Sequence, residues 1–168
     1  MPNTNSSNSE CFVGLGDANN FTDGMWQIGW NPNQKGQEGT FGAIRTDFGD
    51  GNVIGSTDLR DGRWHHIASV FIGGQKKDDV AELVRHYVDG KLESVSGFRN
   101  QKILSDTDEI TLTMGAPVHN YSSGSYKGWL DEVYLFDSAL TPSQISHLMN
   151  SNEPPEASEI VPEVDSKN

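Results

Sequence analysis

The stretch YKGWLDEVYLFDSALTPSQISHLMN, residues 126–150, carries the clearest structural signals in the chain. Residues 129–136 (WLDEVYLF) alternate between two apolar-rich rows, a period of two that fits a strand and cannot form one helical stripe. We therefore expect a strand over residues 129–136. Thr141, Pro142 and Gln144 then have the spacing of a helix N-cap, a first-turn proline and a capping-box partner. They predict a short helix over residues 142–149.

Composition favours strands and turns over a helical bundle. The 168 residues are the length of one domain, and 34% hydrophobic content with 18 glycines and little helical periodicity is typical of an all-β chain. Short alternating segments recur between turn dipeptides such as Asp89-Gly90, which is hairpin chemistry. The fold class predicted is an antiparallel β-sandwich, a jelly roll, with one short C-terminal helix.

The two ends differ in composition from the rest. Residues 1–10 are rich in Asn and Ser and offer almost nothing apolar to offset the entropy of ordering, so we expect them to be disordered. Residues 151–168 (SNEPPEASEIVPEVDSKN) are acidic and proline-rich, which is typical of a tail or linker. The domain is accordingly expected over residues 11–150.

Charge and hydropathy exclude several classes of partner. A formal net charge of −12, with no Lys or Arg cluster to offset it, opposes binding to nucleic acid. No apolar run approaches the ~20 residues that a membrane helix needs, so no membrane insertion is expected. The N-terminal residues also lack the basic and apolar regions of a signal peptide. Cys11 is the single cysteine, which rules out an internal disulfide.

Three motifs, in this order along the chain, resemble the laminin-G-like, concanavalin A-like jelly rolls. They are DGRWHHIA at residues 61–68, YVDGKL at residues 87–92, and GWLDEV at residues 128–133 with Ala139-Leu140 after it. The resemblance covers residues 11–150, and it implies a location outside the cell or on its surface. It also implies that Trp64 and Val133 belong to the core. The first strands of the family are missing, which predicts an open strand edge capable of self-association.

No catalytic residues are predicted, and the chain is not expected to be an enzyme. Glycosidases on this fold carry a Glu-x-Asp-x-(x)-Glu strand that brings acid and nucleophile to about 5–5.5 Å, and no such string occurs here. Asp131 and Glu132 are sequence neighbours, so on a strand they point to opposite faces and cannot share a substrate. The histidines match no zinc spacing.

The resemblance implies calcium as a cofactor, held by Asp131, because in many such sandwiches the aspartate that opens the closing strand ligates the ion. Calcium prefers several oxygen ligands at 2.3–2.6 Å. An alternative loop site comprises four acidic or amide side chains, namely Asp47, Asp50, Asn52 and Asp58. The other interpretation of Asp131 is that it caps a turn.

Aromatic residues outside the core are the candidates for ligand binding, since sugar rings stack on Trp and Tyr. Tyr121, Tyr126 and Trp129 flank or lie in the loop of residues 119–127 and are the predicted ligand-binding residues. Trp26, Trp30 and Trp64 follow strand periodicity, which favours the core.

The function predicted is a non-catalytic binding or adhesion module that recognises a glycan or a protein partner with the help of calcium. Two alternatives stay open. One is a structural spacer domain of a larger surface protein, and the other is a degenerate glycoside hydrolase. Because one fold serves many functions, the ligand depends on the site.

Overall fold

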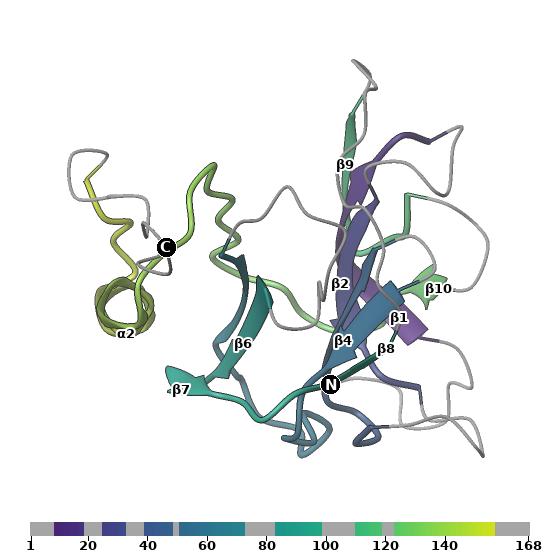
Figure 1. Ribbon diagram of the computed structural model, residues 1–168, viewed down its shortest axis with the longest axis horizontal. Coiled ribbons are helices and arrows are strands. Elements are labelled where there is room, and N and C mark those ends of the chain that lie inside the picture. Colours follow the sequence, from purple (N-terminus) through teal and green to yellow (C-terminus); the bar gives the residue numbers. More distant parts are fainter. Residues whose placement is uncertain are drawn as a thin grey trace, which may run out of the picture.

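The computed structural model describes residues 9–18, 25–32, 39–48, 51–72, 83–98, 110–118 and 123–156. Within these ranges the regular secondary structure consists mostly of strands, with one helix near the C-terminal end of the chain (Figure 1). The elements are β1 Ser9–Gly16, β2 Trp26–Trp30, β3 Ile44–Phe48, β4 Gly51–Ile54, β5 Ile67–Phe71, β6 Val84–Val88, β7 Lys91–Leu92, β8 Ser96–Phe98, β9 Thr111–Met114, β10 Ser123–Ser125 and α2 Pro142–Ser151.

Seven strands form a large sheet in the order β10-β1-β2-β3-β4-β8, with β9 also paired to β1. All neighbours in it are antiparallel except β1 and β10. One edge of β1 is shared, because its first residues pair with β10 and its later residues, from Val13 on, pair with β9. A register shift between Cys11 and Val13 lies where one partner gives way to the other, as expected of a β-bulge that re-aims a strand.

Strands β5, β6 and β7 form a small antiparallel sheet, and the two sheets pack face to face. Alternate residues of β3 and β6 fill the space between them. One apolar cluster joins Phe48 and Val53 of the large sheet to Val84 of the small one. A second joins Ile44 and Val88. The prediction of an antiparallel β-sandwich is confirmed.

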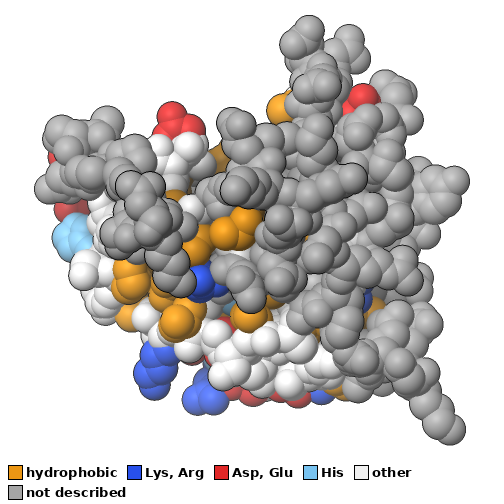
Figure 2. Space-filling view, viewed as in Figure 1, with side chains coloured by type: hydrophobic (Ala, Val, Ile, Leu, Met, Phe, Trp, Pro, Cys, Tyr) orange, Lys and Arg blue, Asp and Glu red, His pale blue; other side chains and the backbone are white. Residues whose placement is uncertain are grey.

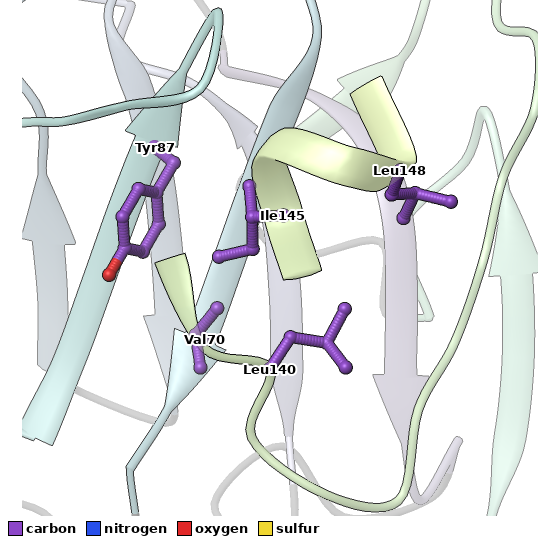
Figure 3. Packing of buried hydrophobic residues seen from close by; sticks show 5 residues of the cluster. All are labelled: Val70, Tyr87, Leu140, Ile145 and Leu148. Atoms are coloured by element: carbon purple, nitrogen blue, oxygen red, sulfur yellow. The ribbon is translucent and has the colours of Figure 1, made fainter. Parts of the chain in front are cut away.

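Helix α2 forms a third layer on the outer face of the small sheet (Figure 1). Its first turn is the predicted capping box, in which the Thr141 hydroxyl accepts the Gln144 N–H and the Gln144 side chain accepts the Thr141 N–H. Figure 3 shows Ile145 pointing from the helix toward Tyr87 and Val70, the core that this layer adds. The predicted helix is thus confirmed, two residues longer than expected.

A polar contact lies between the two apolar clusters in the interior of the sandwich. The hydroxyl of Thr46 on β3 lies 2.8 Å from Nε2 of His86 on β6 and 2.7 Å from the hydroxyl of Ser69 on β5. His86 and Thr46 have no solvent exposure. Burial disfavours the charged imidazole and lowers the pKa of His86 to about 4, so the ring is neutral at physiological pH.

The strand predicted for residues 129–136 is wrong. These residues form no ladder with any strand that the structure describes, and exposed and partly buried side chains alternate only from residue 133 on. Glu132 has a φ of 51°, a left-handed conformation that interrupts an extended chain. The sequence therefore carries a period-two pattern, but no strand among the described residues lies beside it to complete a sheet.

Trp64 and Val133 are not core residues, which corrects the prediction from the family motifs. The Trp64 side chain is 67% exposed and that of Val133 is 39% exposed. Trp64 precedes β5, which begins at Ile67, and Val133 belongs to the unpaired segment, so neither faces the opposite sheet. Trp30 is buried as expected, and Trp26 packs at the margin of a core cluster.

We predict that Ile145→Ala lowers the free energy of unfolding by about 2–5 kcal/mol, because it leaves a cavity between α2 and the small sheet. Trp64→Ala, which removes a larger but exposed side chain, should change it by no more than about 0.5 kcal/mol. Urea denaturation of the two variants measures both values. A larger loss for Trp64→Ala than for Ile145→Ala would contradict the packing described above.

His86 makes the fold sensitive to acid. Between pH 6.5 and pH 4 the His86 imidazole is protonated in the unfolded chain but stays neutral in the folded chain. The free energy of unfolding therefore falls as the pH falls. At about 1.36 kcal/mol per pH unit, this contribution amounts to about 3 kcal/mol. We expect His86→Phe to reduce the loss of stability between pH 7 and pH 4 by that amount, measured by urea denaturation at both values. An unchanged loss would show that His86 is protonated in the folded state.

Candidate functional site

The predicted ligand-binding segment is anchored to the edge of the large sheet. After β10, the backbone N–H of Tyr126 donates to the Gly115 carbonyl at 2.8 Å. The next N–H, of Lys127, donates to Oε2 of Glu10, a buried side chain of β1, at 3.0 Å. These bonds to β1 and to the end of β9 fix the position at which the chain leaves the sheet.

Tyr126 and Trp129, both predicted to bind ligand, have different surroundings. The Tyr126 ring meets the ring of Phe12 edge to face, with 4.8 Å between centroids, and is only partly exposed. Burial, together with the nearby Glu10 charge, raises the pKa of Tyr126. Gly128 lies directly against the same phenol ring, leaving no space there for a side chain. Tyr126 therefore anchors the segment.

Trp129, in contrast to Tyr126, has a largely exposed side chain. Its side chain is 76% exposed, so an indole face is open to solvent next to a firmly held turn. Tyr121, the third predicted residue, lies outside the described residues. The described chain thus places one anchoring and one exposed aromatic side chain within four residues of each other.

Asp131 is exposed, and its Oδ1 accepts the N–H of Glu132 at 3.1 Å. The Glu132 carboxylate in turn accepts a hydrogen bond from the Tyr134 hydroxyl at 2.8 Å. In the described part of the chain, no three His, Cys, Asp or Glu side chains come together as a metal site would require. Calcium takes six to eight oxygens, so Asp131 and Glu132 alone do not make a calcium site.

The alternative loop site is not assembled by the described residues either. Asp47 forms an ion pair with Arg45 at 2.7 Å, and Asp58 forms one with Arg60 at 2.6 Å. Each carboxylate is thereby already neutralised. Asp50 lies outside the described residues.

A polar row that was not predicted from the sequence crosses the outer face of the large sheet. Gln27, Asp47 and Asn52 stand opposite one another on β2, β3 and β4. They face away from the small sheet, because Thr46, the residue before Asp47 in β3, faces it. Burial raises the pKa of Asp47, and Arg45 opposes that shift. With a single carboxylate, paired to a guanidinium, the row lacks the second carboxylate of a glycosidase.

A histidine with two carboxylate partners joins the turn before β5 to the β6–β7 hairpin. Nδ1 of His65 lies 2.9 Å from Asp89, and its Nε2 lies 3.0 Å from Asp61. Burial disfavours the charged ring, but the hydrogen bonds and charges of Asp89 and Asp61 outweigh it and raise the pKa of His65 above 6.5. Both ring nitrogens are engaged, so His65 has none left to act as a general base.

This contact predicts a stability term opposite in sign to that of His86. Because its folded pKa is raised, His65 contributes stability that is fully present below pH 6.5 and is lost as pH rises through the raised value. We expect His65→Gln to flatten the decline of unfolding free energy above pH 6.5, measured by urea denaturation from pH 6 to pH 9. His147→Gln, at an exposed position on α2, is the control and should leave the decline unchanged. A decline that persists in His65→Gln would contradict the assignment.

Comparison with protein families gives one match. A laminin G family model, described as the concanavalin A-like lectin/glucanases superfamily, matches residues 1–146. Searches of curated proteins and of solved structures gave no match. Among the described residues, no helix has the length and apolar character that a membrane span requires. The match agrees with the two-sheet sandwich and its single described helix, and it covers most of the sequence. The chain belongs to the laminin G branch of the concanavalin A-like lectin/glucanase superfamily.

Proposed function

We propose that the chain is a non-catalytic binding domain of an extracellular or cell-surface protein, and that it recognises a carbohydrate or protein ligand at the surface around Trp129. The exposed indole of Trp129 is the observation that carries this proposal. Large aromatic side chains supply much of the binding energy of many interfaces. Tyr126 and the hydrogen bonds of Tyr126 and Lys127 hold the turn before it in place, which limits the entropy lost on binding.

Two features of the described residues support the absence of catalysis. The polar row on the outer face of the large sheet offers one carboxylate, Asp47, whereas glycoside hydrolysis uses two. His65 has both ring nitrogens bound to Asp61 and Asp89. A general acid or base must be within reach of substrate in the required protonation state, and His65 does not meet this condition.

Calcium enters the proposal as an ion shared with the ligand. Asp131 and Glu132 give exposed carboxylates next to Trp129, and ligand hydroxyl or carboxylate oxygens would have to complete the coordination. An ion that requires the ligand does not stabilise the free domain. Calcium should accordingly strengthen ligand binding and leave the Tm of the free domain unchanged.

We predict that Trp129→Ala weakens binding to any glycan or protein captured on an array by about tenfold or more, which is 1.4 kcal/mol or more. Trp64→Ala is the matched control, since Trp64 is also a largely exposed tryptophan, and it should bind as the wild type does. Arrays probed with calcium and with chelator, on wild type and Asp131→Asn, test the role of the ion.

The array has outcomes that contradict the proposal as well as one that supports it. Equal losses in Trp129→Ala and Trp64→Ala would place the site elsewhere. Binding to no glycan or protein of the array would favour a structural spacer. Turnover of a glycan that stops in Asp47→Asn would favour a hydrolase.

A further inference from the structure

Residues 129–137 place apolar and acidic side chains together at the surface, and we name this region the Trp129 surface. Four of the ten large apolar side chains that are exposed in the described chain lie in its first seven residues, namely Trp129, Leu130, Val133 and Leu135. Figure 2 shows hydrophobic side chains at the surface on the side of the molecule where α2 and the small sheet lie. Seven residues span at most about 24 Å, so one partner face of about 800 Å² can cover them together.

Hydrogen bonds and packing fix the shape of the Trp129 surface. The left-handed backbone of Glu132 bends it at its centre, and the Glu132 N–H donates to Oδ1 of Asp131 at 3.1 Å. The Tyr134 hydroxyl lies between the Glu132 carboxylate, at 2.8 Å, and the Asn152 carbonyl, at 2.9 Å. Tyr134 and Phe136 also pack against the cluster formed by the small sheet and α2. A surface whose shape is set before binding loses less entropy when a partner binds.

The apolar side chains indicate a protein partner rather than a glycan. A sugar ring stacks on an aromatic face, and Trp129 is the one largely exposed aromatic side chain of this surface. Leu130, Val133 and Leu135 are aliphatic, with exposures of 39%, 39% and 65%. Covering aliphatic side chains with the apolar side chains of a protein is favourable, whereas a sugar stacked on Trp129 alone would leave them in water.

The charges of the Trp129 surface indicate which residues should surround the apolar centre of the partner. Asp131, Glu132 and Asp137 are exposed, and none of the ion pairs between described side chains includes them. Lys127 is the one Lys or Arg of residues 126–137. Three carboxylates near one ammonium group leave a local excess of negative charge, which is complementary to lysines and arginines.

A second copy of this chain is a poor occupant of the Trp129 surface. Two copies joined through it would bring the three carboxylates of each close to those of the other, and like charges across an interface oppose association. Each chain also carries a formal net charge of −12, which adds repulsion over a longer range. The same charges oppose binding to nucleic acid.

We propose that the Trp129 surface binds a partner protein that presents apolar side chains surrounded by lysines and arginines. The apolar side chains of the partner cover Trp129 and Leu135, and its cationic groups face Asp131, Glu132 and Asp137. Salt screens the exposed charge pairs, so the affinity should fall as the salt concentration rises. This inference rests on the proposed binding function and names the class of ligand.

The probe is a fluorescent, acetylated peptide of leucine and lysine that forms an amphipathic helix of about four turns. In one control peptide glutamate replaces lysine, and in the other serine replaces leucine. Fluorescence anisotropy against the full chain measures Kd, in chelator so that no divalent ion screens the carboxylates. We expect the Leu-Lys peptide to bind at least about tenfold more tightly than either control, and to lose affinity as NaCl is added.

Leu135→Ser should weaken binding of the Leu-Lys peptide by about tenfold or more, because it removes exposed apolar surface that the partner covers. Leu112→Ser on β9 is the matched control, since Leu112 is 45% exposed and lies on the large sheet. It should bind as the wild type does. Circular dichroism verifies that both variants are folded.

Asp137→Asn tests the charge. It should weaken binding of the Leu-Lys peptide by about two- to fivefold and reduce the dependence on salt, as expected for one exposed ion pair. The amide keeps an oxygen for the Ser138 hydroxyl, which now donates to Asp137. Asp58→Asn is the control, because it changes the net charge by the same amount at a carboxylate that is paired with Arg60. It should bind as the wild type does.

Several outcomes would overturn the inference. Equal binding of either control peptide would show that charge or apolar surface alone acts. Equal losses in Leu135→Ser and Leu112→Ser, or in Asp137→Asn and Asp58→Asn, would place the contact elsewhere. If a glycan of the array binds in a manner dependent on Trp129 while the Leu-Lys peptide does not bind, the proposed function stands and this inference fails. If Trp129→Ala leaves the binding of every array ligand and of the peptide unchanged, both fail.

Discussion

The hydrogen bond between Thr46 and His86, buried between the two sheets, sets the alignment on which the rest of the structure depends. Along β3 the inward residues are Ile44, Thr46 and Phe48, and along β6 they are Val88, His86 and Val84. The apolar residues at each end meet one another, and the polar pair meets in the middle. Sliding one sheet by two residues would place His86 against Ile44 or Phe48, and a buried polar group without a partner costs about 1–3 kcal/mol. Thr46 and His86 thereby specify one register, which apolar packing alone would leave less sharply defined.

The outer faces of the two sheets differ in polarity and in what covers them. The outer face of the small sheet is apolar at Val70 and Tyr87 and is covered by α2. The outer face of the large sheet carries the polar row with Asp47. The chain from β10 to α2 runs from the large sheet to the side of the small sheet that the helix covers (Figure 1). This connection contains Trp129; Tyr126 and Lys127 hold its start, and Tyr134 and Phe136 pack at its end.

Local signals predicted the parts of the structure that are determined locally. The capping box of Thr141 and Gln144 is complete within four residues, so its sequence suffices, and the Asp89-Gly90 turn likewise joins β6 to β7. Residues 129–136 have the alternation of a strand, but a strand also needs a neighbour, and that depends on the whole chain. The prediction that Trp64 is buried was wrong for the same reason, because its motif does not show which residue faces the opposite sheet. Strand β10 was not predicted because Ser123–Ser125 has no apolar pattern. The contacts of His65 were not predicted because Asp89 is 24 residues away in the sequence.

The sandwich is complete around His86, whereas residues 129–135 have no strand partner among the described residues. Hydrogen exchange of the free protein, followed residue by residue by NMR, tests it most directly, since amide protons in a stable ladder exchange only when the ladder opens. We expect slow exchange at the amides of β6 that pair with β5 and β7, and fast exchange at the amides of residues 130–135. Protection of those amides equal to that of β6 would contradict it, because the segment would then already be a strand with a partner.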